Sequence, residues 1–204
     1  IGEKAGAIRF LSRIVGPFFS KLFPGVPKDH PVNGELLMNF SANMLGLDNA
    51  ATPLGLKAMQ SLQELNPHKE SASNAQIMFL ALNTSGLTII PISIIAQRAI
   101  LGAANPTDVF VPIIIATYVS TLTAILYVGF RQRLSLFNKT VAAWLGGISL
   151  LLAALVFWFT QMDRESMRTA SSLLSNGTLL GIIILFMAGG LYKKINIWES
   201  FIDG

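Results

Sequence analysis

The sequence NFSANMLGLDNAATPLGLKAM, residues 39–59, decides the fold, because it places a polar break inside an apolar chain. Apolar residues recur at helical spacing on both sides of the break, whereas its centre holds Gly46, Asp48, Asn49 and Pro53, which interrupt or end helices. We therefore expect two short helices that meet at a polar turn. At membrane depth such a turn must be covered by protein or by a water-filled cavity, and broken helices form the binding sites of many transporters.

Composition and three long apolar runs predict an all-α integral membrane protein. Hydrophobic residues make up 52% of the 204 residues and charged residues 13%, about half the usual charged share. The runs at residues 109–130, 141–161 and 173–192 contain no charged residue over 22, 21 and 20 positions. About 20 apolar residues cross the hydrocarbon core of a bilayer. We expect regular transmembrane helices over 108–130 and 141–161, and a third within 173–204.

The region before residue 102 is predicted to hold an amphipathic helix and two broken elements. Residues 1–34 contain an amphipathic helix and a loop, and we expect the helix to lie along the membrane interface, with packing on the bundle as the alternative. Residues 35–65 contain two arms of about 17 and 20 Å, each too short to span alone. Gly46 is expected to follow the first arm, and Thr52 is expected to cap a second arm that begins at Pro53. Residues 74–101 form a helix interrupted at Asn83–Gly86, either as a polar site or as a simple kink whose hydroxyls bond to their own helix.

Loop charge favours a re-entrant hairpin over a broken span for residues 35–65. The loop 131–139 carries three basic residues and two lysines follow the last apolar run, which places both on the cytoplasmic side. The loop 102–108 has one acid and no base, and the loop 161–172 is balanced in charge, so both are expected outside. Counting back across 74–101 puts residues 66–73 inside. Five basic residues before residue 29 favour the same side, so both ends of the hairpin are expected to be cytoplasmic.

Polar side chains gather at the two breaks and are the candidate solute-binding residues. They are Asn43, Asp48, Asn49, Thr52 and Lys57 in the hairpin, and Asn83, Thr84, Ser85 and Thr88 in the second break. Asp48 is either a substrate-binding or coupling acid beside a helix N-terminus, or the partner of Lys57 in an ion pair that locks the tip. The two breaks reach similar depth from one face, so we expect Asn49 and Asn83–Ser85 to share one cavity.

Other functional classes find little support. The sequence shows no phosphate loop, nucleophile elbow or metal-spaced histidine pair, which predicts no catalytic residues, no metal and no cofactor. The net charge is +4, but the basic residues lie at loop edges without interleaved aromatic residues, so no nucleic-acid partner is expected. Cysteine is absent, which excludes disulfides and thiolate chemistry.

The sequence resembles the spore maturation protein A family. The resemblance rests on residues 43–59, on LQELNP at 62–67, on LFPGVPK at 22–28, on LNTSGLTIIP at 82–91 and on NPTD at 105–108. It covers roughly residues 1–130 and implies a bacterial inner-membrane protein with a gate, or nucleoside-recognition, domain over 35–130. The tail LYKKINIWESFIDG, residues 191–204, is similar to the opening of spore maturation protein B, which implies a fused or separate B-like partner.

Two functions follow from these observations. The first is half of a transporter or channel for a small polar, nucleoside-like solute. Such a protein is embedded in the lipid bilayer, which is its expected partner. The second is a non-transporting membrane scaffold that supports envelope assembly. Substrate, coupling ion and oligomeric state, including a homo-oligomer, are left open by the sequence.

Overall fold

The computed structural model describes residues 7–136 and 138–192, and every regular element in that part of the chain is a helix. In chain order the first helices are α2 (Ala7–Leu22), α3 (Val32–Met44), α4 (Asp48–Leu65) and α5 (Asn74–Ser85). They are followed by α6 (Ile92–Ile100), α7 (Phe110–Arg131), α8 (Lys139–Thr160) and α9 (Arg164–Tyr192). The all-α expectation is confirmed for these residues.

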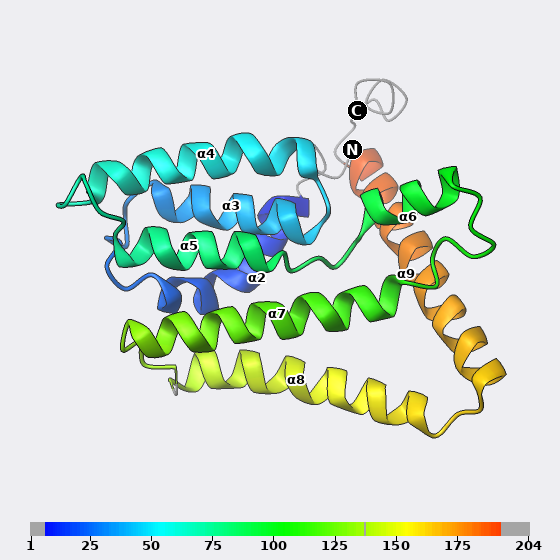
Figure 1. Ribbon diagram of the computed structural model, residues 1–204. Coiled ribbons are helices and arrows are strands. Elements are labelled where there is room, and N and C mark those ends of the chain that lie inside the picture. The colour runs from blue at the N-terminus through cyan, green and yellow to red at the C-terminus, as the bar shows by residue number, and fades with distance from the viewer. Residues whose placement is uncertain (1–6, 137, 193–204) are drawn as a thin grey trace.

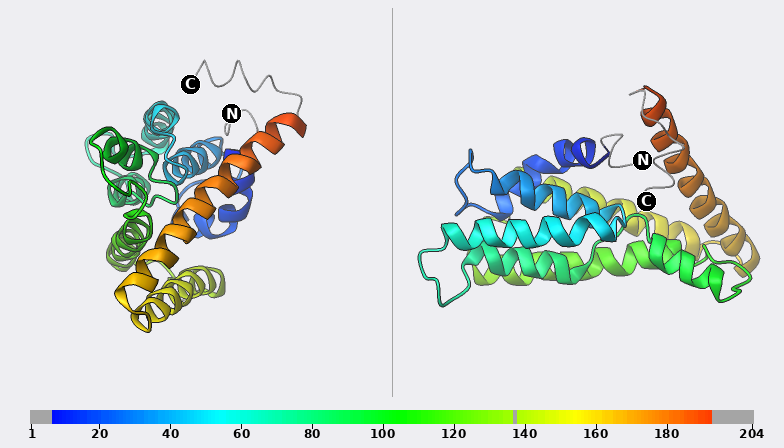
Figure 2. Two further views of the ribbon diagram at one scale, coloured as in Figure 1. Left: turned by 90° about the vertical axis from the view of Figure 1, so that its right-hand side faces the viewer. Right: turned by 90° about the horizontal axis from the view of Figure 1, so that it is seen from above.

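Five helices, α3, α4, α5, α7 and α8, run side by side, and α9 lies across one end of this bundle (Figures 1 and 2). Helices α3 and α4 form an antiparallel hairpin. The loops at 23–31, 66–73 and 132–136 lie at the opposite end of the bundle from α9 (Figure 1). Both ends of the hairpin therefore lie near the end of the bundle where α7 connects to α8.

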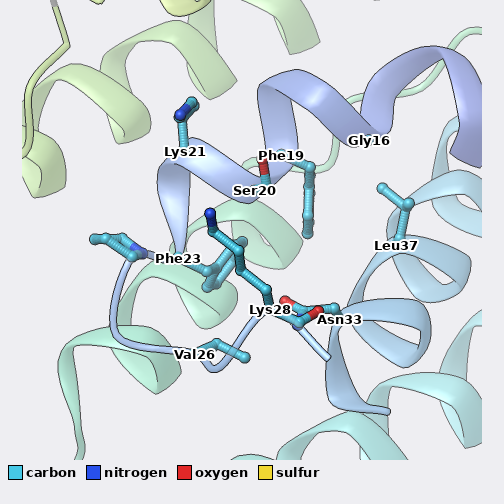
Figure 3. Close-up of a pocket in the computed structure, with 10 residues that line it drawn as sticks. Gly16, Phe19, Ser20, Lys21, Phe23, Val26, Lys28, Asn33 and Leu37 are labelled. Atoms are coloured by element: carbon cyan, nitrogen blue, oxygen red, sulfur yellow. The ribbon is translucent and has the colours of Figure 1, made fainter. Parts of the chain in front are cut away.

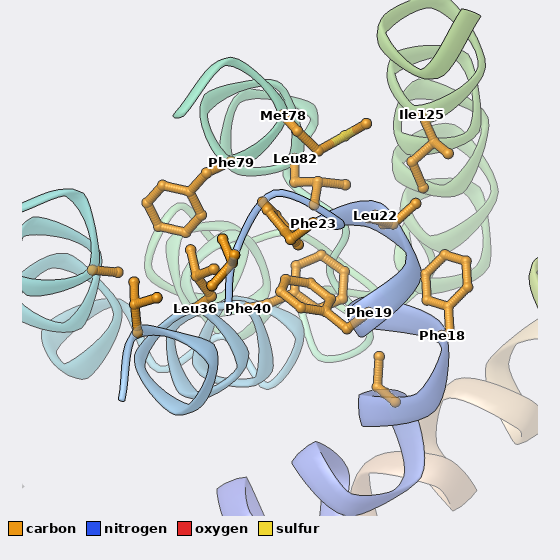
Figure 4. Packing of buried hydrophobic residues seen from close by; sticks show 14 of the residues in the cluster. Phe18, Phe19, Leu22, Phe23, Leu36, Phe40, Met78, Phe79, Leu82 and Ile125 are labelled. Carbon is orange, nitrogen blue, oxygen red and sulfur yellow. The ribbon is translucent and has the colours of Figure 1, made fainter. Parts of the chain in front are cut away.

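An aromatic and aliphatic core joins α2 to the hairpin and to α5 (Figure 4). Phe19 of α2 packs against Phe40 of α3 and against Phe23, with ring centroids 5.1 and 5.0 Å apart. Leu22 and Leu82 are fully buried in the same cluster. Val15, Phe18, Phe19 and Leu22 of its apolar stripe are buried, so α2 packs on the bundle along this stretch. Its position relative to a membrane interface stays a prediction.

Among the described residues, α7 and α8 are the helices long and apolar enough to cross a membrane. Most of their length is not buried within the molecule, and large apolar side chains of α8 such as Leu150, Phe157 and Trp158 are exposed. A core helix of a soluble protein would bury such a surface, whereas a helix that faces lipid leaves it exposed. These are the features of a membrane protein.

The structure corrects two predicted boundaries. Helix α4 begins at Asp48, so Thr52 is not its cap and Pro53 lies inside the helix. The helix can start early because the Leu47 carbonyl accepts hydrogen bonds from the amides of Ala50 and Ala51, at 3.0 and 2.9 Å.

Helix α9 is also longer than expected and includes most of the predicted loop 161–172. Asp163 accepts hydrogen bonds from the amides of Glu165 and Ser166, at 3.0 and 3.2 Å, and so caps a helix that starts at Arg164. The charged residues that suggested a loop form the first turns of this helix. Residues 193–204, which carry most of the B-like tail, and residues 1–6 lie outside the described part of the chain.

Candidate functional site between the two helix breaks

The turn that ends α3 is a hydrogen-bonded C-cap centred on Gly46. The Leu47 amide bonds to the Ala42 carbonyl at 2.9 Å, and the Gly46 amide bonds to the Asn43 carbonyl at 3.0 Å. This is a Schellman arrangement, which places its C′ residue in the left-handed region, and Gly46 has a φ of 65°. The prediction that Gly46 follows the first arm is confirmed.

The second break lies directly against this turn. Helix α5 ends at Gly86, which has a φ of 62°. After it, the amides of Ile89 and Ile90 donate hydrogen bonds to the Met44 carbonyl, at 2.8 and 3.2 Å. A Cβ atom at Gly46 would overlap the carbonyl oxygen of Ile90, so the two backbones are in close contact. The amides of the second break thus satisfy a carbonyl that the end of α3 leaves free.

A polar stripe on α3 faces the other helices of the site. Glu35, Asn39 and Asn43 recur at intervals of four residues and therefore share one face of the helix. The Asn39 side-chain amide donates to the Ala51 carbonyl of α4 at 2.7 Å. The Asn43 amide donates to the side-chain oxygen of Asn83 on α5 at 2.8 Å. These bonds hold three helices together through amide groups.

The amides border an open cavity of about 330 Å³ between α3, α4 and α5. Its polar lining comes from Asn39, Asn43, Thr52 and Asn83, and its apolar wall includes Met59 and Phe79. This volume lies at the low end of the range for small-molecule sites, about 300–1,000 Å³. Uncharged donors and acceptors beside an apolar wall suit a neutral polar solute with a flat ring.

The structure divides the predicted binding residues between two places. Asn43, Thr52 and Asn83 line the cavity, whereas Asn49 is exposed on the surface and is not part of its lining. On the other side of the break the hydroxyl of Ser85 pairs with that of Thr121 on α7 at 2.9 Å.

The other residues of the second break follow the same division. The Thr88 amide contacts the Thr117 hydroxyl of α7 at 3.4 Å, and Thr84 is exposed. The expectation of one shared cavity is therefore wrong for Asn49, Thr84 and Ser85. Asn83 and Ser85 are two residues apart on a helix, and such positions point in roughly opposite directions.

Lys57 pairs with a residue that the sequence reading did not single out. Its Nζ lies 3.3 Å from Oε1 of Glu35, whose side chain is only 8% exposed while that of Lys57 is 66% exposed. The other carboxylate oxygen of Glu35 is buried and has no hydrogen-bond partner within the described residues. The side chain of Asp48 lies outside the described part of the structure. Glu35 could have been found from the four-residue spacing that it shares with Asn39 and Asn43.

Comparison with known proteins places the site within a matched domain. The family described as "nucleoside recognition" (Gate) matches residues 1–101, which include the cavity and both breaks. Spore maturation protein A of Bacillus subtilis (strain 168) is 48% identical over 136 residues, covering 65% of this chain and 69% of that protein. This chain belongs to the spore maturation protein A family. No solved structure matches it significantly.

Proposed function

We propose that this member of the spore maturation protein A family forms half of a membrane transporter or channel for a small polar, nucleoside-like solute. The observation that carries the proposal is the amide-lined cavity at the meeting point of two broken helices. The description of the matched family as nucleoside recognition supports the same solute class. The role is one of binding and passage, without covalent chemistry.

The cavity amides keep hydrogen-bonding capacity for a ligand. Asn43 donates to Asn83, but its own side-chain oxygen accepts no hydrogen bond within the described residues. The Asn83 amide donates one hydrogen to the Phe79 carbonyl at 2.9 Å, which leaves its second hydrogen available. A side-chain acceptor and donor close together match the donor and acceptor edge of a nucleobase.

In the proposed arrangement α3 and α4 enter and leave the bacterial inner membrane from the cytoplasmic side, α5 and α6 together form one broken span, and α7, α8 and α9 each cross the membrane. A B-like domain or subunit supplies the second half. Single cysteines test this topology, because the chain has no cysteine of its own. Lys28→Cys, Glu70→Cys and Ser135→Cys change exposed positions and should be labelled only from the cytoplasm, whereas Ala104→Cys should be labelled from outside. Labelling of Lys28→Cys and Glu70→Cys from opposite sides would replace the hairpin with a span.

Ligand binding is tested with the purified full chain in nanodiscs. Uridine and adenosine at millimolar concentration should raise the midpoint of thermal unfolding. The rise should disappear in Asn43→Ala and persist in Asn74→Ala, a control that removes an exposed amide at the far end of α5 from Asn83. If neither nucleoside shifts the midpoint of the unchanged protein, the nucleoside proposal is wrong.

The scaffold function has one observation in its favour. The bond between Asn43 and Asn83 closes two helices against each other, as a purely structural contact would. Asn43→Ala is compared with the unchanged protein in the same assay. If Asn43→Ala lowers the unfolding midpoint, but neither nucleoside shifts the midpoint of the variant or of the unchanged protein, the amide cluster acts in folding and the scaffold function is favoured.

A further inference from the structure

A second pocket lies where α2 ends and α3 begins, and it shares no lining residue with the amide cavity. It encloses about 330 Å³ and combines two lysines, Lys21 and Lys28, with an apolar floor. Figure 3 shows Lys21 rising from the last turn of α2 and Lys28 from the loop that follows, with the ring of Phe19 between them and α3. No part of the proposed solute site uses this pocket.

The two lysines have charges that the structure leaves unpaired. Neither forms an ion pair or hydrogen bond with any described residue, and both are exposed. Lys69 at the same end of the bundle behaves differently, since its Nζ donates to the carbonyls of Gln63 and Glu64 at 2.6 and 3.2 Å. The charges of Lys21 and Lys28 are therefore available for an anion.

The loop that carries Lys28 is held in place. The Asn33 side-chain amide donates to the carbonyls of Pro27 and Lys28, at 2.7 and 3.2 Å. The His30 ring accepts a hydrogen bond from the Val32 amide at 3.2 Å. A preorganised loop reduces the entropy lost when Lys28 engages a ligand.

The floor of the pocket is built for an apolar group. Phe19, Phe23 and Val26 are buried in the main core and present one edge to the pocket, and Leu37 of α3 forms the opposite wall. At Gly16 an added Cβ would lie 3.6 Å from Leu37, so the pocket is closed on this side where α2 approaches α3. A ligand that fills this site carries a negative charge at one end and an apolar chain at the other.

The surroundings of the pocket indicate where that ligand comes from. The same end of the bundle carries Arg131, Arg133 and Lys139, which predict a cytoplasmic location. Anionic lipids of the cytoplasmic leaflet attract basic groups near the membrane surface, and basic pockets beside transmembrane helices bind lipid headgroups. We propose that Lys21 and Lys28 bind the headgroup phosphate of an anionic phospholipid whose acyl chain packs on the apolar floor of the pocket.

The test measures lipid retention on the full chain. Native mass spectrometry of the protein extracted from phosphatidylglycerol vesicles should show one retained phosphatidylglycerol. Its apparent affinity should fall about 10- to 30-fold in Lys21→Gln/Lys28→Gln, since each lysine near a membrane surface contributes about a factor of five. The matched control Arg131→Gln/Lys139→Gln removes the same charge from the same end outside the pocket and should retain the lipid. Unfolding midpoints in phosphatidylcholine nanodiscs check that both double variants are folded.

Three results would overturn the proposal. Equal loss of lipid in both double variants would show that only the general charge of this end matters. Undiminished retention in Lys21→Gln/Lys28→Gln would remove the lysines from the site. If soluble glycerol 3-phosphate binds as tightly as phosphatidylglycerol in a lysine-dependent way, the apolar floor plays no part and the ligand is a phosphate compound from water.

Discussion

Replacing Gly46 by alanine tests the contact between the two helix breaks. Gly46 has a φ of 65°, and its added Cβ would overlap the Ile90 carbonyl oxygen. The left-handed conformation alone costs about 1–2 kcal/mol for a residue with a side chain. The overlap must also push the second break away, which removes two hydrogen bonds to the Met44 carbonyl, each worth about 1 kcal/mol. We expect a total loss of about 3–4 kcal/mol.

Gly86→Ala is the matched control, because Gly86 has nearly the same φ, 62°, and its added Cβ would come no closer than 4.0 Å to another group. Gly86→Ala should lose only the free energy needed to hold alanine in the left-handed conformation, about 1–2 kcal/mol. In a chain of this length about 1 kcal/mol lowers the unfolding midpoint by about 3 °C. Thermal unfolding in nanodiscs should therefore show a loss of about 10 °C for Gly46→Ala and about 4 °C for Gly86→Ala.

Hydrogen exchange identifies the origin of the difference. The amides of Ile89 and Ile90 should be protected in the unchanged protein and in Gly86→Ala, and should exchange faster in Gly46→Ala. Equal losses of the unfolding midpoint in the two variants, or unchanged protection of Ile89 and Ile90 in Gly46→Ala, would refute the close packing of the two breaks.

Two further predictions follow from charged residues outside the cavity lining. Lys57→Met should lower the free energy of unfolding by about 1–2 kcal/mol, which is less than the 3–5 kcal/mol typical of a fully buried pair because the Lys57 side chain is 66% exposed. Adding Glu35→Gln removes the buried charge that Lys57→Met leaves behind, so the double variant should regain most of the lost stability in thermal unfolding. No restoration would mean that Glu35 is not that buried charge. Hydrogen bonds from Ser166 and the Glu165 amide hold the pKa of Asp163 below its ordinary value of 3.8. A carboxylate with a lowered pKa stabilises the fold at a pH above its ordinary pKa, and this stabilisation is lost as the pH falls through the lowered pKa. Protection of the first turn of α9 against hydrogen exchange should therefore decline below about pH 4. The first turn of α5, capped by the uncharged hydroxyl of Ser73, is the internal control, and a parallel decline there would contradict the assignment to Asp163.

Local patterns in the sequence account for much of this fold. Uninterrupted apolar runs determine α7 and α8, because a helix that faces lipid needs length and the absence of charge more than any particular partner. Glycine in the left-handed conformation ends α3 and α5, and both glycines stand in the sequence between helical patterns. The spacing of residues along α3 likewise places Glu35, Asn39 and Asn43 on one face before any packing is known.

Local signals were less reliable where capping competes with composition. Pro53 suggested the start of α4, yet the Leu47 carbonyl begins the helix five residues earlier. Charged residues after Gln161 suggested a loop, yet Asp163 caps α9 there. In both cases one acceptor group at the helix start, which accepts two hydrogen bonds from backbone amides, outweighed the average character of the segment.

The pairing of the site residues was decided by tertiary structure. The sequence placed polar groups at two breaks, but it did not determine that Asn83 turns toward Asn43 while Ser85 turns toward Thr121. It also left open whether Lys57 had a partner at the tip or, as found, on the first turn of α3. Phe79 and Leu82 of α5 are buried in the same core cluster as Phe40 and Leu22, and the burial of this face sets the rotation of α5 about its axis. Helical periodicity fixes which side chains share a face, whereas only this packing of helices distant in sequence fixes which faces meet.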